Sequence, residues 1–359
     1  MNNSLNKNHL ANKLTLLPLT ALGLLAAVPA GAAPTGGAGA SAVPVPSYHL
    51  LKKVALGGEG GWDYLMVDPD MRRVYISRGT HVMVVDADTY KVVGDIPDTS
   101  GVHGIAIASD LGKGFISDGR ANAVTIFDLK TLKTLGTVTV GTGPDCIVYE
   151  PKTQRVFTFN GRSSDATAID AKSGKVAGTI ALGGRPEYAA VDGTGTVYDN
   201  LESTSEIVAI DAQALKIKKR WSLAPAESPS GLAINQNEHQ LFSACDGGKM
   251  AISSTVSGKA GATAPIGNGP DAAAYDPGES LAFSSNGQDG TLTVLHEAAP
   301  GAYTALQTVA TQAGARTMAL DTKTHQIFLV TATPDTANPG EGRRRNYVPG
   351  SFTLLVVGP

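Results

Sequence analysis

The chain is poor in charged and aromatic residues. Only 17% of its 359 residues are charged and 6% are aromatic, against about 25% charged residues in an average soluble protein. Because exposed helices are built mainly from lysine, glutamate and similar residues, this composition disfavours long surface helices. The formal net charge of −3 disfavours a globally basic nucleic-acid binder.

Long hydrophobic runs are also missing, with one exception near the N-terminus. Residues 14–28 are mostly apolar and follow Lys7 and Lys13. This run is shorter than the ~20 residues that a membrane-spanning helix needs, and it precedes small residues that end at Ala32. The pattern predicts a secretory signal peptide over residues 1–32, with an uncleaved anchor as the alternative. The mature protein is then expected in the periplasm or outside the cell, without a membrane span.

Motifs of common enzymes are absent as well. The sequence contains no Gly-x-Ser-x-Gly elbow, phosphate-binding loop, His-Glu-x-x-His motif or haem-attachment motif. Residues 33–47 are rich in glycine, alanine and proline, which predicts a flexible linker. We therefore expect the folded domain and its functional site within residues 48–359.

What the sequence does contain is abundant glycine, 42 residues, and an internal repeat. Seven segments open in a related way, with glycine or proline beside one polar residue. The aligned polar residues are Asp63, His103, Asp145, Glu187, Ser230, Asp271 and Arg316. They recur at intervals of 40 to 45 residues, which is the length of a propeller blade.

Each repeat has the composition of four short strands. In the third repeat we expect strands at residues 146–149, 155–159, 166–169 and 175–180, separated by turns rich in Pro, Gly and Asn. The sequence therefore predicts an all-β, seven-bladed β-propeller with four-stranded antiparallel blades. A pair of β-sandwich domains is the alternative, but it does not explain the regular interval. The seventh repeat lacks one strand, and residues 49–56 are expected to supply it and close the ring.

The repeats resemble a known family. The pattern Gly-x-x-Pro-acid, then four intervening residues and acid-Pro, occurs at residues 141–151 and 267–277. Together with the Val-Asp strand endings and the closing residues 349–358, it is similar to the YncE-like, YVTN-repeat β-propellers of bacteria. The resemblance implies the propeller fold over residues 48–359. It implies no particular reaction, because most members have none assigned.

In a propeller, the first strand of each blade lines the central channel, so the aligned polar residues are expected around one channel mouth. The loops that follow the second strands should open on the same face. These loops contribute a flanking set of polar residues: Arg78, Asp118, Arg120, Asn160, Arg162, Asn200 and Asn286. Four carboxylates in the ring predict an acidic mouth whose groups shift one another's pKa.

Three interpretations of this mouth stay open. It is a water-filled polar channel, or a site for a small molecule, peptide or protein, or a metal site. Carboxylate and amide oxygens suit Ca²⁺ or Mg²⁺, as in hydrolytic lactonase propellers of the gluconolactonase kind, whereas His103 alone among acids is no zinc signature. We expect a binding module that requires no cofactor, with a calcium- or magnesium-dependent hydrolase as the alternative, and a monomer that does not bind nucleic acid.

Three further features need an interpretation. Trp62 is either a stacking platform for a ligand or an aromatic cap of the fold. The long loop 331–349, with Arg343, Arg344 and Arg345, should leave from the face of the channel mouth, as a lid or as a solvated loop. Cys146 and Cys245 lie in different repeats with one repeat between them, so we expect two small buried residues rather than a disulfide.

Overall fold

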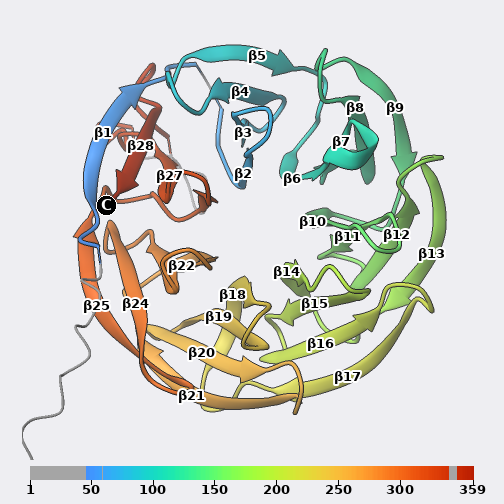
Figure 1. The fold of residues 1–359 in the computed structure, drawn as a ribbon. Helices are drawn as coiled ribbons and strands as arrows, with labels where there is room; N and C mark the ends of the chain where they lie inside the picture. The colour runs from blue at the N-terminus through green and yellow to red at the C-terminus, as the bar shows by residue number, and fades with distance from the viewer. Residues whose placement is uncertain (1–45, 59, 339–345) are drawn as a thin grey trace, which may run out of the picture. The chain divides into compact units, whose positions relative to one another are not determined.

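The structure is a computed structural model that describes residues 46–58, 60–338 and 346–359. In these residues, seven antiparallel sheets of four strands are arranged as blades around a central channel (Figure 1). The predicted seven-bladed β-propeller is therefore confirmed. The predicted signal peptide, residues 1–32, and all but the last two residues of the predicted linker lie outside the described residues.

The first four blades follow one another along the chain, each from an inner to an outer strand. Blade one contains β2 (Leu65–Asp68), β3 (Arg73–Ser77), β4 (Val82–Asp86) and β5 (Val92–Ile96). Blade two contains β6 (Val102–Ala108), β7 (Lys113–Asp118), β8 (Ala123–Asp128) and β9 (Thr134–Thr139), with the short helix η1 (Ser109–Leu111) after β6. Blade three contains β10 (Pro144–Glu150), β11 (Arg155–Asn160), β12 (Asp165–Asp170) and β13 (Lys175–Ala181). Blade four contains β14 (Pro186–Val191), β15 (Thr196–Leu201), β16 (Glu206–Asp211) and β17 (Lys216–Ser222).

The last three blades complete the ring. Blade five contains β18 (Glu227–Asn235), β19 (Gln240–Asp246), β20 (Lys249–Ser254) and β21 (Lys259–Pro265). Blade six contains β22 (Pro270–Asp276), β23 (Leu281–Asn286), β24 (Thr291–Ala299) and β25 (Ala302–Ala310). Blade seven contains β26 (Met318–Asp321), β27 (Gln326–Thr331) and β28 (Thr353–Gly358), and its outer strand is β1 (His49–Ala55).

The first and the last strand that the structure describes meet in blade seven. Strand β1 pairs antiparallel with β28, with His49 opposite Gly358 and Ala55 opposite Thr353. This arrangement confirms the predicted closure by the N-terminal strand, and it removes the open edge that β28 would otherwise expose. Figure 1 shows β1 lying along the outside of β28.

The geometry of the turn after the third strand explains why this strand ends in an apolar residue followed by aspartate in blades one to four. In blades one to three, a side-chain oxygen of Asp86, Asp128 or Asp170 accepts the backbone N–H three residues later at 2.7–2.8 Å. This Asx turn reverses the chain toward the outer strand. The repeated residue is thus explained by turn geometry and needs no role in binding.

The core lies between neighbouring blades. Phe157 and Phe159 of β11, for example, are fully buried in one cluster with Val197 and Val208 of blade four. The second and third strands are covered on both faces, so most of their residues are buried. Aligned polar residues such as Asp145 and Glu187 stand near the start of the inner strands, where the chain enters the channel.

Candidate functional site

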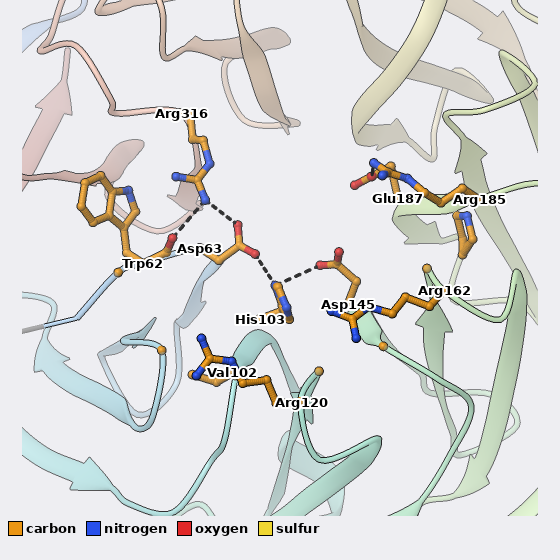
Figure 2. Close-up of a pocket in the computed structure, with 17 residues that line it drawn as sticks. Trp62, Asp63, Val102, His103, Arg120, Asp145, Arg162, Arg185, Glu187 and Arg316 are labelled. Atoms are coloured by element: carbon orange, nitrogen blue, oxygen red, sulfur yellow. Dashed lines mark hydrogen bonds and ion pairs between the residues drawn. The ribbon is translucent and has the colours of Figure 1, made fainter. Parts of the chain in front are cut away.

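Five of the seven aligned polar residues gather at one channel mouth. Asp63 and Arg316 precede the inner strands of blades one and seven, while His103, Asp145 and Glu187 lie in β6, β10 and β14. They line a pocket of about 620 Å³, called the mouth pocket below (Figure 2). Its other lining side chains are Trp62, Val102, Arg120, Arg162, Arg185 and Pro186, with glycines between them.

A chain of charged contacts crosses the mouth pocket. The Nη2 of Arg316 lies 3.1 Å from Asp63 Oδ1, and Asp63 Oδ2 lies 2.6 Å from His103 Nδ1. The same His103 nitrogen is 3.5 Å from Asp145 Oδ1, and Figure 2 shows the three contacts in sequence. Arg316 also contacts Asp271 on its other side, with Nε 2.7 Å from Oδ2. Residues from five blades are therefore held in one ion-pair network.

The network fixes the charge of its members. Burial alone would raise the pKa of Asp63, but the hydrogen bond from His103 and the charge of Arg316 hold it below its ordinary value. Burial alone would lower the pKa of His103, but the hydrogen bond to Asp63 and the charge of Asp145 raise it to about 9. At neutral pH, Asp63 is thus ionised and His103 protonated.

The remaining acids of the ring bind protons more readily. Burial raises the pKa of Asp145 to about 7, with His103 opposing and Asp63 adding to the rise. Burial and the charge of Asp145 raise the pKa of Glu187 to about 8, although Arg185 opposes them. Burial raises the pKa of Asp271 to about 6 against the effect of Arg316. At neutral pH the mouth therefore carries less negative charge than it would if all its carboxyl groups were ionised.

The mouth pocket is not acidic in composition, which corrects the sequence expectation. Its lining contains three acids and one histidine, but four arginines: Arg120, Arg162, Arg185 and Arg316. Arg185 was not among the predicted site residues. It stands in the repeat where Gly143 stands in blade three, directly before the Pro that opens the inner strand. That alignment was available from the sequence.

Two further ring residues lie away from the mouth pocket. Asp271 lines a neighbouring pocket of about 580 Å³ with Gln288 and Tyr347, and Arg316 borders both pockets. Ser230 instead joins two blades, since its hydroxyl donates to the Pro270 carbonyl at 2.8 Å. Of the seven aligned residues, five therefore share one pocket.

The flanking set divides into two groups. Arg120 and Arg162 line the mouth pocket. The other five are buried, most of them in second strands and not in loops: Arg78, Asp118, Asn160, Asn200 and Asn286. The side chains of Asp118, Asn160 and Asn286 lie inside their blades. Each forms a hydrogen bond with a threonine hydroxyl of the next strand, at donor–acceptor distances of 2.6–3.0 Å. None of these five residues lines the mouth pocket. Four of them are held within the blades, which corrects the expectation for those four, whereas Arg78 lines a neighbouring pocket of about 530 Å³ with Gly61 and Tyr347.

Buried Arg78 and Asn200 also have structural contacts. The guanidinium of Arg78 lies over the ring of Phe352 at 3.4 Å. The side-chain amide of Asn200 donates to the carbonyls of Ser230 and Gly231, both at 3.0 Å. Each residue therefore ties its own blade to another segment of the ring.

Trp62 packs as part of the fold. Its side chain is buried, and its ring lies 4.8 Å from that of Tyr347 and 5.7 Å from that of Phe352. This favours the aromatic cap over the stacking platform. Because Tyr347 belongs to the long loop 331–349, that loop does return to the face of the channel mouth. The three arginines expected to form a lid, 343–345, lie outside the described residues.

An aromatic pair crosses the channel beside the carboxyl groups. Tyr64 and Tyr188 directly follow Asp63 and Glu187 in the sequence, and their ring centroids are 5.0 Å apart. They come from blades one and four, which lie far apart around the ring (Figure 1). Burial raises the pKa of both hydroxyls, so both are neutral. Both tyrosines stand directly after an aligned ring residue, but nothing in the repeat shows that they meet.

Three residues of the mouth could together offer ligand atoms to a metal ion. Suitable atoms of Asp63, His103 and Asp145 lie within 4.8 Å of one another. Both oxygens of Asp63, however, already contact His103 and Arg316. Ca²⁺ and Mg²⁺ prefer about six or more oxygen ligands, and this cluster offers two carboxylates and one imidazole. Its donor set does not match those ions well.

The two cysteines agree with the sequence interpretation. Cys146 and Cys245 are buried and not joined in a disulfide. No helix in the described parts of the chain is long and apolar enough to cross a membrane.

Comparisons with known proteins place the fold and leave the activity open. The fold and the site together define a seven-bladed β-propeller with a charged pocket at one channel mouth. No protein-family model matches the sequence, and no curated protein matches it. Solved structures do match in shape. One from Kuenenia stuttgartiensis hydrazine synthase is 16% identical, with a TM-score of 0.65, covering 75% of this chain and 92% of that one.

Two further matches are WD40-type or complex-forming structures. The RRP9 WD40 repeats are 11% identical with a TM-score of 0.71, covering 86% of this chain and 97% of that one. A chain of the mitotic checkpoint complex is 13% identical with a TM-score of 0.71, covering 93% of this chain and 98% of that one. At such low identity these likenesses support the propeller fold alone.

Proposed function

We propose that this chain is an exported binding propeller whose ligand occupies the mouth pocket. The observation that carries the proposal is the convergence of charged side chains from five blades on one pocket of about 620 Å³. That volume lies within the ~300–1,000 Å³ of typical ligand sites. A plain water channel needs no such network, in which Asp63 bonds both His103 and Arg316.

Export is supported by the sequence alone. The basic residues Lys7 and Lys13, the apolar run 14–28 and the small residues ending at Ala32 have the order of a cleaved signal peptide. The ligand is then a molecule of the periplasm or the surroundings of the cell. The resemblance to YncE-like propellers, carried by the repeat pattern, stays part of the proposal.

Gly161 allows the pocket to be blocked without disturbing the fold. It lines the mouth pocket, and a Cβ placed there would come no closer than 3.8 Å to other atoms. Gly136, on the outer strand β9, has nothing within 4 Å of such a Cβ. Gly161→Leu is therefore a blocking variant, and Gly136→Leu is its matched control.

The test is a thermal-shift screen of the full chain against small organic acids, neutral sugars, amino acids, nucleotides, CaCl₂ and MgCl₂. We expect at least one compound to raise the melting temperature of the wild type and of Gly136→Leu, and not that of Gly161→Leu. A screen in which no compound shows this difference would contradict a ligand site at the mouth.

A calcium- or magnesium-dependent hydrolase is the second candidate, favoured by the proximity of Asp63, His103 and Asp145. We rank it below the binding function because Asp63 is already engaged by Arg316 and the oxygen ligands are few. The same screen separates the two candidates. A large shift with CaCl₂ or MgCl₂ that Asp145→Asn removes would favour the hydrolase.

A further inference from the structure

We infer that the mouth pocket recognises a small oxyanion, the carboxylate or phosphate group of its ligand, through Arg120 and Arg162. The inference rests on the proposed function and names the class of ligand for the same pocket. It starts from the four arginines that line the pocket, which differ in the partners that they have.

Two of the four arginines are already neutralised. Arg316 contacts Asp63 and Asp271, and Arg185 contacts Glu187 and Glu202. Within the part of the chain that the structure describes, the guanidinium groups of Arg120 and Arg162 make no hydrogen bond and no ion pair. Figure 2 shows Arg162 reaching toward Asp145 and His103, while Arg120, from the neighbouring blade, extends beside Val102. The pocket therefore holds two guanidinium groups with no internal partner.

The two side chains are held in the same way by the repeat. The backbone N–H groups of Arg120 and Arg162 donate to the carbonyls of Ser100 and Thr142, both at 3.2 Å. Each stem lies over a glycine, Gly101 or Gly143, where a Cβ would fall 2.5 Å or 2.9 Å from the arginine Cγ. Both glycines have positive φ, 69° and 65°. A glycine is thus required beneath each stem.

Blade six has the same arrangement with a neutral side chain. Gln288 lies over Gly269, and its N–H donates to the Asn268 carbonyl at 3.2 Å. The repeat therefore accepts glutamine at this position, and the fold does not need arginine there. Two neighbouring blades nevertheless carry arginine facing one pocket.

The acids of the pocket do not compete strongly with an incoming anion for Arg120 and Arg162. Asp63 is engaged by His103 and Arg316, and Glu187 by Arg185. Burial raises the pKa of Asp145 to about 7 and that of Glu187 to about 8, so both lose negative charge near neutrality. A planar guanidinium matches carboxylate and phosphate groups with two parallel hydrogen bonds. Two such groups in one pocket with a protonated His103 favour an oxyanion over a neutral or cationic ligand.

The test uses citrate, glucuronate and inorganic phosphate as probes, measured by isothermal titration calorimetry on the full chain at constant ionic strength. The variants are Arg120→Gln and Arg162→Gln, which install the residue that blade six carries. Arg162→Lys keeps the charge and loses the paired hydrogen bonds. Lys218→Gln, on the exposed outer strand β17, removes one positive charge far from the pocket and serves as the control.

We expect at least one probe to bind the wild type and Lys218→Gln equally. Each glutamine variant should weaken that binding at least tenfold, with Arg162→Lys in between. Stronger binding of citrate and glucuronate than of phosphate would identify a carboxylate ligand, and the reverse order a phosphate. A probe that binds all variants equally would overturn the inference.

Failure of the inference is distinguishable from failure of the proposed function. A neutral or cationic ligand that Gly161→Leu excludes, but that both glutamine variants bind as well as wild type, would overturn the oxyanion and leave the pocket as a site. If no compound distinguishes Gly161→Leu from wild type, both are overturned.

Discussion

Single glycines decide how closely neighbouring blades approach. Gly231 follows Ser230 on β18, where a Cβ would lie 2.5 Å from backbone atoms of Ala272 and Ala273 in blade six. No rotamer change relieves a contact with backbone. Gly161 is the contrast, because its Cβ would make only ordinary contacts.

We therefore expect Gly231→Ala to reduce the free energy of unfolding by ~1–3 kcal/mol, the usual cost of overpacking. Gly161→Ala should change it by less than ~1 kcal/mol, with the reduced entropy of the unfolded chain favouring the variant. Urea denaturation followed by tryptophan fluorescence measures both. Equal stabilities of the two variants would show that blades five and six can separate at little cost.

The repeat predicts which residues stand at equivalent positions, but it does not predict where their side chains point. The repeat placed Asp63, His103, Asp145 and Glu187 at one mouth because each stands at the same point of its unit. It could not show that Asp118 and Arg120, two residues apart, point to opposite environments. Asp118 is the last residue of β7 and bonds Thr125 in the blade, while Arg120 lies beyond the turn glycine and lines the pocket.

Among the elements, β1 has the particular task of closing the ring. Its anchor is Tyr48, one residue before the strand, which is fully buried 5.1 Å from the ring of Phe283 in blade six. The backbone N–H of Tyr48 donates to the side-chain oxygen of Gln307 at 3.0 Å, and the side-chain amide of Gln307 donates to the Tyr48 carbonyl at 2.6 Å. The Tyr48 hydroxyl has no hydrogen-bond partner among the described residues.

Two substitutions of Tyr48 should therefore differ widely. Tyr48→Ala leaves a cavity under the closing strand and is expected to lower the free energy of unfolding by ~3–5 kcal/mol. Tyr48→Phe removes a buried hydroxyl without a partner and should leave stability equal or higher. Chemical denaturation and limited proteolysis near residues 49–55 provide the measurement. If Tyr48→Phe proves as damaging as Tyr48→Ala, the hydroxyl has a bond in solution.

The elements themselves were largely predictable, because turn chemistry and alternation mark each strand. The expected strand 155–159 is β11 (Arg155–Asn160), and the expected 146–149 is the middle of β10 (Pro144–Glu150). What could not be predicted is contact between elements from different blades. Tyr64 and Tyr188 meet across the channel although more than a hundred residues separate them. Such a contact depends on the diameter of the closed ring, which no local pattern encodes.

At the scale of the whole molecule, the channel mouth concentrates groups that bind protons more tightly in the folded chain. The pKa values of Asp145, Glu187 and His103 are raised to about 7, 8 and 9. A group whose folded pKa is raised stabilises the fold while it is protonated, and this contribution is lost as pH rises through the folded pKa. Asp63, with its lowered pKa, acts oppositely, but only at acidic pH.

The free energy of unfolding should consequently fall by a few kcal/mol between about pH 6 and about pH 9, since one pKa unit corresponds to about 1.4 kcal/mol. Glu187→Gln removes the group whose pKa of about 8 lies inside this window, so its profile should be flatter. Glu227→Gln, an exposed acid at the start of β18, is the matched control and should follow the wild type. Urea denaturation at several pH values provides the measurement. The reference is the unfolded chain, in which these groups have ordinary pKa values. A free energy of unfolding that rises with pH, or a profile that Glu187→Gln leaves unchanged, would mean that the carboxyl groups of the mouth are already ionised in the folded state.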